Sequence, residues 1–268
     1  MTKSDFSEKP ALKEVFGIAF AGFNMREEAL QNINRYDMGR FTPMFYRTNV
    51  FLHSKRVYLL IKDVLPLINP VYKGLFNSQE ALTLALIHDD AEIVSGDVLR
   101  YHAERWPQEK LAQVRVDEER AIEVLSNKWS KHLNGFNYRK LLYNALNKDT
   151  LEAQVVSFFD KTDAYCECLH EVFAGNKLFV NPAFAYVGTL DSYPVKFREL
   201  NKIMPSNNPL LVLPKDVTLN RLREIAEQGM FHTAISVSNI TEFPQYDKWK
   251  EITIKNLGID FLIETREK

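Results

Sequence analysis

The chain has 268 residues, of which 46% are hydrophobic and 26% are charged, a composition ordinary for a globular protein with a sizeable core. Its formal net charge is −1 at pH 7, so no basic field favours nucleic acid or an anionic membrane surface. No apolar run approaches the length of a membrane span, and the first residues have no apolar signal core.

The sequence predicts mostly helices. In chain order they cover residues 11–22, a segment from a cap at Thr48 or Asn49 to an end near Pro66 or Pro70, Asn77 to Gly96, about 107–133, Asp149 to Ala174, and Thr218 to Gln228. Asn77 with Glu80, and Asp149 with Glu152, follow the capping-box spacing that starts a helix. Prolines at 182, 194, 205, 209 and 214 predict short irregular pieces after Asn176, and EITIKNLGIDFLIE is compatible with a hairpin or with a helix and a strand.

Three of the predicted helices carry residue types that bind metals on an apolar face. His53 falls on the stripe of Val50, Val57, Leu60, Ile61 and Val64, the pair His88-Asp89 follows LTLALI, and Asp160 lies on the inner face of the helix that starts near Asp149. A buried carboxylate needs a cation or hydrogen-bond donors. Two imidazoles and two carboxylates suit one divalent Mn, Fe, Co or Zn ion, and Mg less well. The alternative is a core histidine with carboxylates in caps or ion pairs.

Three stretches resemble a known family. HDDAEIVSGD at 88–97 is similar to the signature HDxxExxxGD of the bacterial 5′-deoxynucleotidases, members of the HD superfamily of metal-dependent phosphohydrolases. DKTDAYCECLHEVFAGN at 160–176 and RYDMGR at 35–40 match two further family segments, and the resemblance covers about residues 28–200. It implies an all-α fold, an HD-domain helical bundle over residues 1–204, with an irregular C-terminal extension over 205–268 packed on the same domain.

The resemblance also implies roles for individual residues. His53, His88, Asp89 and Asp160 would bind the metal, with Asp163 competing with Asp160 for the last position. Glu92 and Asp97 would be catalytic acids or bases, Arg35 would bind the phosphate, and Tyr36 would lie against the sugar. Because the segment 41–52 is about three residues longer than in the family, Arg40 and Arg47 are alternatives to Arg35.

The implied reaction is hydrolysis of the phosphomonoester of a (deoxy)nucleoside 5′-monophosphate or a similar small phosphate. One alternative is a dNTP triphosphohydrolase, for which Lys55, Arg56 and Arg100 are candidate cations, and another is a non-catalytic metal- or nucleotide-binding module.

Cys166 and Cys168 are poorly spaced to pair on a helix and suit a reduced, cytoplasmic protein. The expected partners are a nucleotide substrate and, as an option, a second copy in a homodimer; no nucleic acid or membrane is expected.

Overall fold

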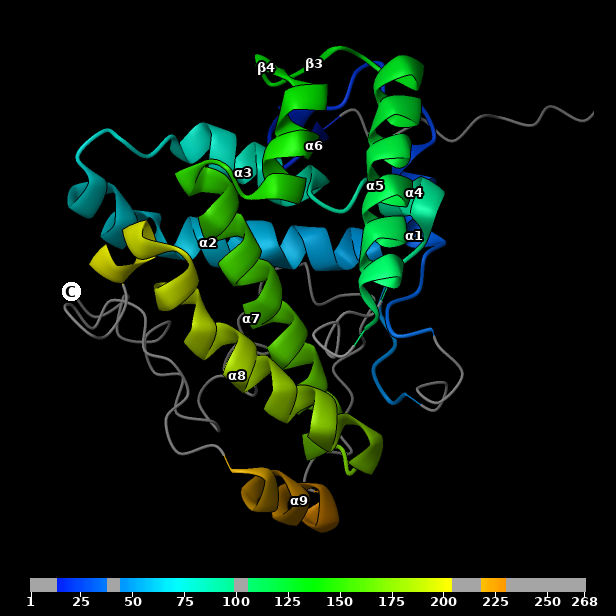
Figure 1. The fold of residues 1–268 in the computed structure, drawn as a ribbon, viewed down its shortest axis with the longest axis vertical. Helices are drawn as coiled ribbons and strands as arrows, with labels where there is room; N and C mark the ends of the chain where they lie inside the picture. The colour runs from blue at the N-terminus through cyan, green and yellow to red at the C-terminus, as the bar shows by residue number, and fades with distance from the viewer. Residues whose placement is uncertain (1–13, 38–43, 99–105, 204–217, 230–268) are drawn as a thin grey trace, which may run out of the picture.

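Helices make up most of the computed structural model, which describes residues 14–37, 44–98, 106–203 and 218–229 (Figure 1). The α-helices are α1 (Arg26–Gln31), α2 (Val50–Tyr72), α3 (Ser78–Ile87), α4 (Glu92–Ser95), α5 (Gln108–Lys128), α6 (Tyr138–Asn147), α7 (Leu151–Phe173), α8 (Val180–Lys196) and α9 (Leu219–Gln228). Two 3-10 helices, η3 (Lys177–Phe179) and η4 (Arg198–Lys202), flank α8. The predicted all-α class is therefore confirmed.

The core lies where α2 and α7 cross. In Figure 1, α2 runs across the middle of the molecule, and α8 lies alongside α7. Helix α3 packs on both α2 and α7, while α5 packs on α4 and α6. The predicted apolar stripe of α2 is confirmed, because Val57, Leu60, Ile61 and Val64 are fully buried. His53 lies on the same stripe and is fully buried too, so α2 brings an imidazole into the core.

Side-chain caps fix where several helices begin. Asn49 Oδ1 accepts from the Leu52 N–H, and Asn77 Oδ1 accepts from the Glu80 N–H, as the sequence predicts. Thr218 caps α9, as predicted, and Gly229 ends it in the left-handed conformation. The predicted start at Asp149 is wrong by one residue, because Thr150 is the residue whose side chain accepts from the Ala153 N–H.

The predicted helix over 11–22 is wrong in its described part. Residues Glu14–Val15 (β1) and Ile18–Ala19 (β2) form an antiparallel hairpin in which Val15 pairs with Ile18. Phe16 and Gly17, the two residues between the strands, both have positive φ, of 51° and 81°. A two-residue turn with this geometry matches the twist of a hairpin and cannot be part of a right-handed helix.

The predicted helix over 107–133 is also too long, because α5 ends at Lys128. A second hairpin follows, formed by β3 (His132–Leu133) and β4 (Phe136–Asn137) around Asn134-Gly135. Asn134 and Gly135 again have positive φ, and the Asn-Gly dipeptide is the strongest short sequence signal for a two-residue hairpin turn. The hairpin leads directly into α6, a helix that the sequence analysis did not predict.

Prolines end fewer helices than predicted. Helix α2 continues through Pro66 and Pro70 to Tyr72, because each proline removes one hydrogen bond while Ile68 and Tyr72 still bury their side chains. The prediction of short pieces after Asn176 is wrong for α8, which contains Pro182 and Pro194. Pro182 lies in its first turn, where the missing N–H has no partner to lose.

Helix α9, the last helix among the described residues, packs on α7 and α8. The stretch EITIKNLGIDFLIE lies outside the described residues. Among the residues described, no helix has the length and apolar character needed to cross a membrane.

Candidate active site

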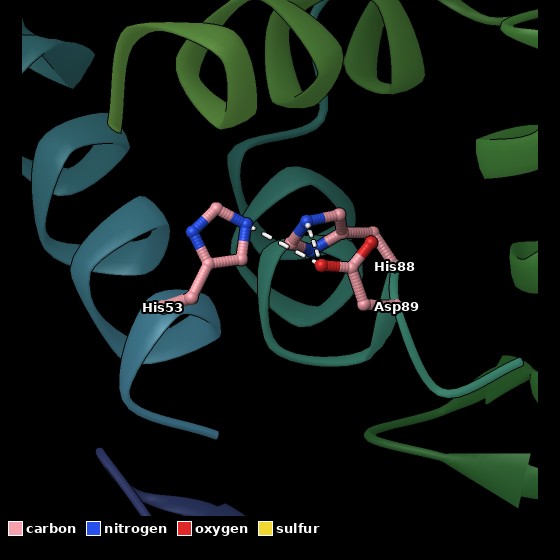
Figure 2. Close-up of side chains that lie close together, drawn as sticks. All are labelled: His53, His88 and Asp89. Atoms are coloured by element: carbon pink, nitrogen blue, oxygen red, sulfur yellow. Dashed lines mark ion pairs between the residues drawn. The ribbon is translucent and has the colours of Figure 1, made fainter. Parts of the chain in front are cut away.

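Three elements bring His53, His88, Asp89 and Asp160 to one point. His53 is in the first turn of α2, His88 and Asp89 follow the last residue of α3, and Asp160 lies near the middle of α7. Figure 2 shows the two imidazole rings close to the Asp89 carboxylate. The ring centroids lie 5.3 Å apart, and the ring planes are tilted by 60°. The core packing of α3 against α2 and α7 therefore assembles the set that the sequence predicted as metal ligands.

The nitrogen and oxygen atoms of this set lie about as close as ligands of one ion. His53 Nε2 lies 3.3 Å from Asp89 Oδ2 and 3.3 Å from Asp160 Oδ1, and His88 Nε2 lies 3.2 Å from Asp89 Oδ2. Neighbouring ligands of an ion bonded at about 2.1 Å are roughly 3 Å apart. Both Nε2 atoms are buried and have no hydrogen-bond partner among the described residues. Buried polar atoms are normally satisfied, so these two atoms fit a bound cation.

The other ring nitrogen of each histidine, Nδ1, already has a hydrogen-bond acceptor. Asp163 Oδ2 lies 2.7 Å from His53 Nδ1, and the Ala85 carbonyl oxygen lies 2.8 Å from His88 Nδ1. An acceptor at Nδ1 fixes the hydrogen on that nitrogen, which leaves the lone pair of Nε2 for a metal. Both imidazoles are thus oriented as ligands.

The charges around His53 favour a cation at this point. Burial lowers the pKa of His53, but Asp160, Asp163 and Asp89 outweigh it and hold the pKa well above its usual value. Burial likewise opposes ionisation of Asp89, yet His88 and His53 keep the pKa of Asp89 well below its usual range. A proton or a divalent metal ion satisfies the same need for positive charge between these groups.

Asp160 and Asp163, which competed for one metal position, lie on different sides of His53. Asp160 Oδ1 faces Nε2, whereas Asp163 faces Nδ1 and also accepts two hydrogen bonds from Arg56. His53, Asp163 and Glu167 form a second group of side chains with metal-binding atoms close together. In this group the Arg56 guanidinium forms ion pairs with both carboxylates. This cluster already has its cation, so Asp160 is the better candidate ligand.

Glu92 comes close to the site because α3 does not continue through residue 92. The chain turns after Ile87, with the Asp90 N–H donating to the Ile87 carbonyl, and restarts as α4 at Glu92. Glu92 Oε2 is buried and has no hydrogen-bond partner in the described chain. Burial raises the pKa of Glu92 well above its usual value, and the charges of Asp89 and Asp97 add to the shift. Both effects favour the protonated form of this carboxyl group.

Asp97 faces the same space from the other side. Gly96 before it has a φ of 77°, a conformation that glycine adopts without strain and that ends α4. Asp97 Oδ2 accepts from the backbone N–H of Tyr36 at 3.3 Å. Burial raises the pKa of Asp97, while the nearby Arg35 guanidinium opposes the shift.

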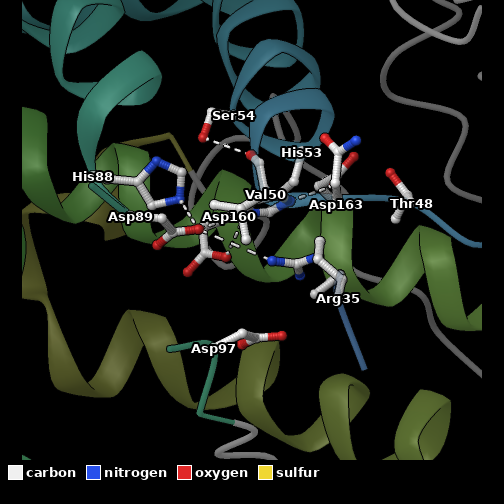
Figure 3. A network of polar contacts seen from close by, with 12 residues as sticks. Arg35, Thr48, Val50, His53, Ser54, His88, Asp89, Asp97, Asp160 and Asp163 are labelled. Carbon is white, nitrogen blue, oxygen red and sulfur yellow. Dashed lines mark hydrogen bonds and ion pairs between the residues drawn. The ribbon is translucent and has the colours of Figure 1, made fainter. Parts of the chain in front are cut away.

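Arg35 is a buried cation that lines the same cavity as these carboxylates. Its Nε donates to Glu167 Oε2 at 2.7 Å, and its Nη1 lies 3.9 Å from Asp89 Oδ2. Figure 3 shows the guanidinium group pointing toward Asp89 and Asp160. Arg47, one alternative, lies 3.5 Å from Asp37 and is not on the cavity wall described below, and Arg40 lies outside the described residues.

Tyr36 does not present its side chain to the site. The ring is fully buried, its hydroxyl group donates to the Ala164 carbonyl oxygen, and it packs edge-on against Phe179. Only its backbone N–H reaches Asp97. The ring of Tyr36, a residue with a φ of 59°, therefore lies in the core, and its predicted place against a sugar stays a prediction.

A cavity of about 330 Å³ opens beside these residues, between α5, α6, α7 and α8. Of the predicted site residues, Arg35, His88, Asp89, Glu92, Asp97 and Asp160 line it. Lys55 and Arg56, proposed for a triphosphate, do not: Lys55 lies over Phe16 and Phe51, and Arg56 is buried behind His53. Arg100 lies outside the described residues.

Lys161 lines the cavity and was not predicted. Its Nζ lies 2.7 Å from Asp160 Oδ2, so the candidate ligand uses its other oxygen toward His53. Burial opposes a charge on each partner, but Lys161 lowers the pKa of Asp160 and Asp160 raises the pKa of Lys161. The sequence signal that could have identified Lys161 is its position directly after Asp160.

The chain is similar to proteins of one family. The model of the 5′-deoxynucleotidase YfbR-like family matches residues 23–200. A 5′-deoxynucleotidase from Yersinia pestis (strain Pestoides F) is 30% identical over 155 residues, which are 56% of this chain and 74% of the relative. One from Yersinia pseudotuberculosis is 29% identical over 60% of this chain and 79% of the relative. One from Pectobacterium atrosepticum is 27% identical over 49% of this chain, and the chain spans 64% of its length.

A solved structure supports the fold alone. A crystal structure of an HD-domain phosphohydrolase from Listeria innocua superposes with a TM-score of 0.52 at 19% identity, covering 90% of this chain and 95% of that chain. The family match extends over more than half of the 268 residues and includes all of the predicted site. The chain therefore belongs to the 5′-deoxynucleotidase YfbR-like family, and the resemblance inferred from HDDAEIVSGD is confirmed.

Proposed function

We propose that this protein is a metal-dependent phosphohydrolase that converts a deoxynucleoside 5′-monophosphate and water into the deoxynucleoside and inorganic phosphate. The observation that carries the proposal is the pair of buried Nε2 atoms of His53 and His88, without hydrogen-bond partners in the described part, next to two carboxylates and a cavity. The 5′-deoxynucleotidase names of the relatives supply the substrate class.

His53, His88, Asp89 and Asp160 would hold one divalent ion. A set of two imidazoles and two carboxylates suits Mn, Co, Fe or Zn, and Mg less well. The chemistry that such an ion supplies is Lewis-acid activation of a phosphoryl oxygen and of water.

The remaining side chains would bind phosphate and move protons. Arg35 would offer its Nη groups to the phosphoryl oxygens and offset the repulsion between the phosphate dianion and the site carboxylates. Glu92, with its raised pKa, would carry a proton at Oε2 and donate it to the leaving 5′ oxygen as the P–O bond breaks. Asp97, held by the Tyr36 N–H, would accept the proton that the attacking water loses as its oxygen forms the new bond to phosphorus.

Lys55 and Arg56, two of the cations expected to bind a triphosphate, do not line the cavity. Their position supports a monophosphate substrate over a triphosphate. A non-catalytic binding module is disfavoured because Glu92 and Asp97 both line the cavity, and binding alone needs neither.

We further propose that residues 1–204 form the catalytic domain and that 205–268 are an extension. A cytoplasmic location is supported by Cys166 and Cys168, which are buried thiols and form no disulfide.

The test is a phosphate-release screen of the purified protein with Mn²⁺, Co²⁺, Zn²⁺ or Mg²⁺. The substrates are deoxynucleoside 5′-monophosphates, the matching ribonucleotides, 3′-monophosphates and dNTPs. We expect turnover of the 5′-deoxynucleoside monophosphates. Release of triphosphate from dNTPs without turnover of monophosphates would contradict the proposal in favour of a triphosphohydrolase, and no hydrolysis of any substrate would favour a binding module.

A further inference from the structure

Three buried charged side chains behind the metal-ligand cluster have no role in the reaction proposed above. They are Arg56 on α2 and Asp163 and Glu167 on α7, with exposed fractions of 1%, 0% and 6%. Arg56 Nε and Nη2 donate to the two oxygens of Asp163 at 2.8 and 2.9 Å. Arg56 Nη2 also donates to Glu167 Oε1, and Nη1 donates to Thr48 Oγ1 at 3.2 Å. Two bonds to Asp163 and one to Glu167 fix Arg56 in one orientation.

Glu167 connects this group to the candidate phosphate ligand. Its Oε1 accepts from Arg56, and its Oε2 accepts from Arg35 Nε at 2.7 Å. One carboxylate therefore holds two guanidinium groups, one by each oxygen. Because Arg35 is held at Nε, its Nη side is directed toward Asp89 and the cavity, as Figure 3 shows for Arg35 and Asp89.

The same residues close a ring of polar contacts in which each carboxylate lies between two nitrogen-bearing side chains. Starting from Asp89, the ring runs through His53, Asp163, Arg56, Glu167 and Arg35 and returns to Asp89. Burying such charges is weak evidence for stability, because desolvation offsets much of the attraction. The ring instead fixes the relative positions of two groups, because it links the His53 imidazole of the candidate metal site to the Arg35 guanidinium group, the candidate phosphate anchor.

Arg35 depends on such a link because no helix fixes its side chain. It lies in a segment that is joined to the start of α2 by the bridge between Asn34 and Asn49 and by the hydrogen bond from the Arg35 N–H to the Thr48 carbonyl. A long side chain on such a segment has many rotamers. A phosphate anchor has to point its fork of donors in one direction, and the Glu167 contact supplies that direction.

We propose that Glu167 and Arg56 are positioning residues that fix the Arg35 guanidinium group for binding the phosphoryl group of the substrate. This inference rests on the proposed function of Arg35 as the phosphate anchor. Glu167 acts directly on Arg35, and Arg56 acts by holding Glu167. Neither touches the substrate, since neither lines the cavity.

The main variant is Glu167→Gln, which keeps the shape of the side chain but removes its charge. The matched control is Glu171→Gln, the same substitution one helical turn later on α7. Glu171 is fully buried as well, but it accepts from the Phe45 and Tyr46 N–H groups and from Asn176 instead of from Arg35. Arg56→Lys is a second variant that keeps the charge and loses the multi-point grip.

Two quantities are measured for each variant with Mn²⁺ present: the Kd for inorganic phosphate by calorimetry, and kcat/KM for deoxyadenosine 5′-monophosphate. Both are repeated in an Arg35→Ala background, because residues that act through one another give non-additive losses. Urea unfolding of each variant records how much of any loss comes from stability.

We expect Glu167→Gln to weaken phosphate binding and kcat/KM by about tenfold in the wild-type background, which is roughly the worth of one charge-assisted hydrogen bond. In the Arg35→Ala background we expect a change of less than about twofold. Arg56→Lys should give a smaller loss of the same kind, and Glu171→Gln should leave the phosphate Kd at its wild-type value even where it lowers the free energy of unfolding.

Equal losses in both backgrounds, an equal loss in Glu171→Gln, or no loss in Glu167→Gln would overturn the proposal. A wild-type protein that binds no inorganic phosphate would overturn it too, because there would be no anchor to position. A wild-type protein that binds phosphate but hydrolyses no nucleotide would instead contradict the proposed function, and the Kd values alone would then decide the positioning role.

Discussion

Asp163 Oδ2 lies 2.7 Å from His53 Nδ1, and this contact determines which nitrogen of His53 faces Asp89 and Asp160. Asp163 is itself fixed by two hydrogen bonds from Arg56. The orientation of the candidate metal ligand His53 on α2 is therefore set by a carboxylate on α7, 110 residues away in the sequence.

Asp163→Asn is the first prediction from this relationship. An amide can still accept from His53 Nδ1–H, but it no longer strengthens the ligand by its charge, so we expect the affinity for Mn²⁺ to fall by about 10- to 100-fold. Metal titration of the chelator-treated protein measures the effect. Asp117→Asn, on the exposed face of α5, is the control. Unchanged affinity in Asp163→Asn would mean that His53 is oriented by packing alone.

Glu92→Gln should separate metal binding from catalysis. Glu92 Oε2 lies buried at the cavity without a hydrogen-bond partner in the described chain, and an amide cannot transfer a proton there. We expect a wild-type metal content with turnover of a nucleotide lowered by about 100-fold or more. Elemental analysis and steady-state kinetics check both halves, with Glu109→Gln on α5 as an exposed control. Wild-type turnover would remove Glu92 from the mechanism.

Lys161→Met should affect metal and substrate in opposite directions. The ammonium group lies 2.7 Å from Asp160 Oδ2, where it repels a divalent ion and attracts a phosphate. Its removal should leave the Mn²⁺ affinity equal or higher and raise KM for the nucleotide by a factor on the order of ten. Lys140→Met, on the exposed face of α6, is the matched control. Loss of metal in Lys161→Met would show that Lys161 is needed to hold Asp160 in place.

The buried histidine His170 predicts a dependence of stability on pH. Burial, helped by the Arg56 charge, lowers the pKa of His170 to about 3, and its ring stacks on Tyr46 at a centroid distance of 3.7 Å. In the unfolded chain its pKa is about 6.5, so between these values the unfolded state binds more protons and stability falls as the pH falls. Above pH 6.5 this contribution is fully present.

The check is urea unfolding of wild type and His170→Phe at pH 7.5 and pH 5. Over this range His170 should account for about 2 kcal/mol of the loss in the wild type, and the phenylalanine variant should lose that much less. Groups that titrate in both proteins cancel in the difference. A pH dependence identical in the two proteins would show that His170 does not carry it.

The sequence identified the candidate site better than the fold around it. His53, His88, Asp89 and Asp160 were found because each lies on an apolar face, and helix packing then brings such faces together. The caps at Asn77 and Thr218 were found because a cap depends on contacts within four residues. Local chemistry of this kind can be read from one sequence.

The failures have physical reasons as well. The two hairpins were missed although Phe16-Gly17 and Asn134-Gly135 each carry a glycine at a turn position, because strands of two residues leave no periodic pattern. The link from Arg56 to Asp163 and Glu167 spans more than 100 residues, so no spacing rule could reveal it. Pro182 predicts a break when it is read as a helix-interior residue, but in α8 it lies in the first turn, where proline is tolerated.

The central claim, that His53, His88, Asp89 and Asp160 hold a divalent ion used to hydrolyse a nucleotide, is tested most directly by phosphate release from deoxyadenosine 5′-monophosphate. The assay compares wild type as purified, after treatment with EDTA, and after addition of Mn²⁺ or Co²⁺, with His88→Ala carried through the same steps. We predict that EDTA abolishes release, that the metal restores it in wild type, and that His88→Ala stays inactive throughout. Release that survives EDTA, or a His88→Ala variant as active as wild type, would contradict the account.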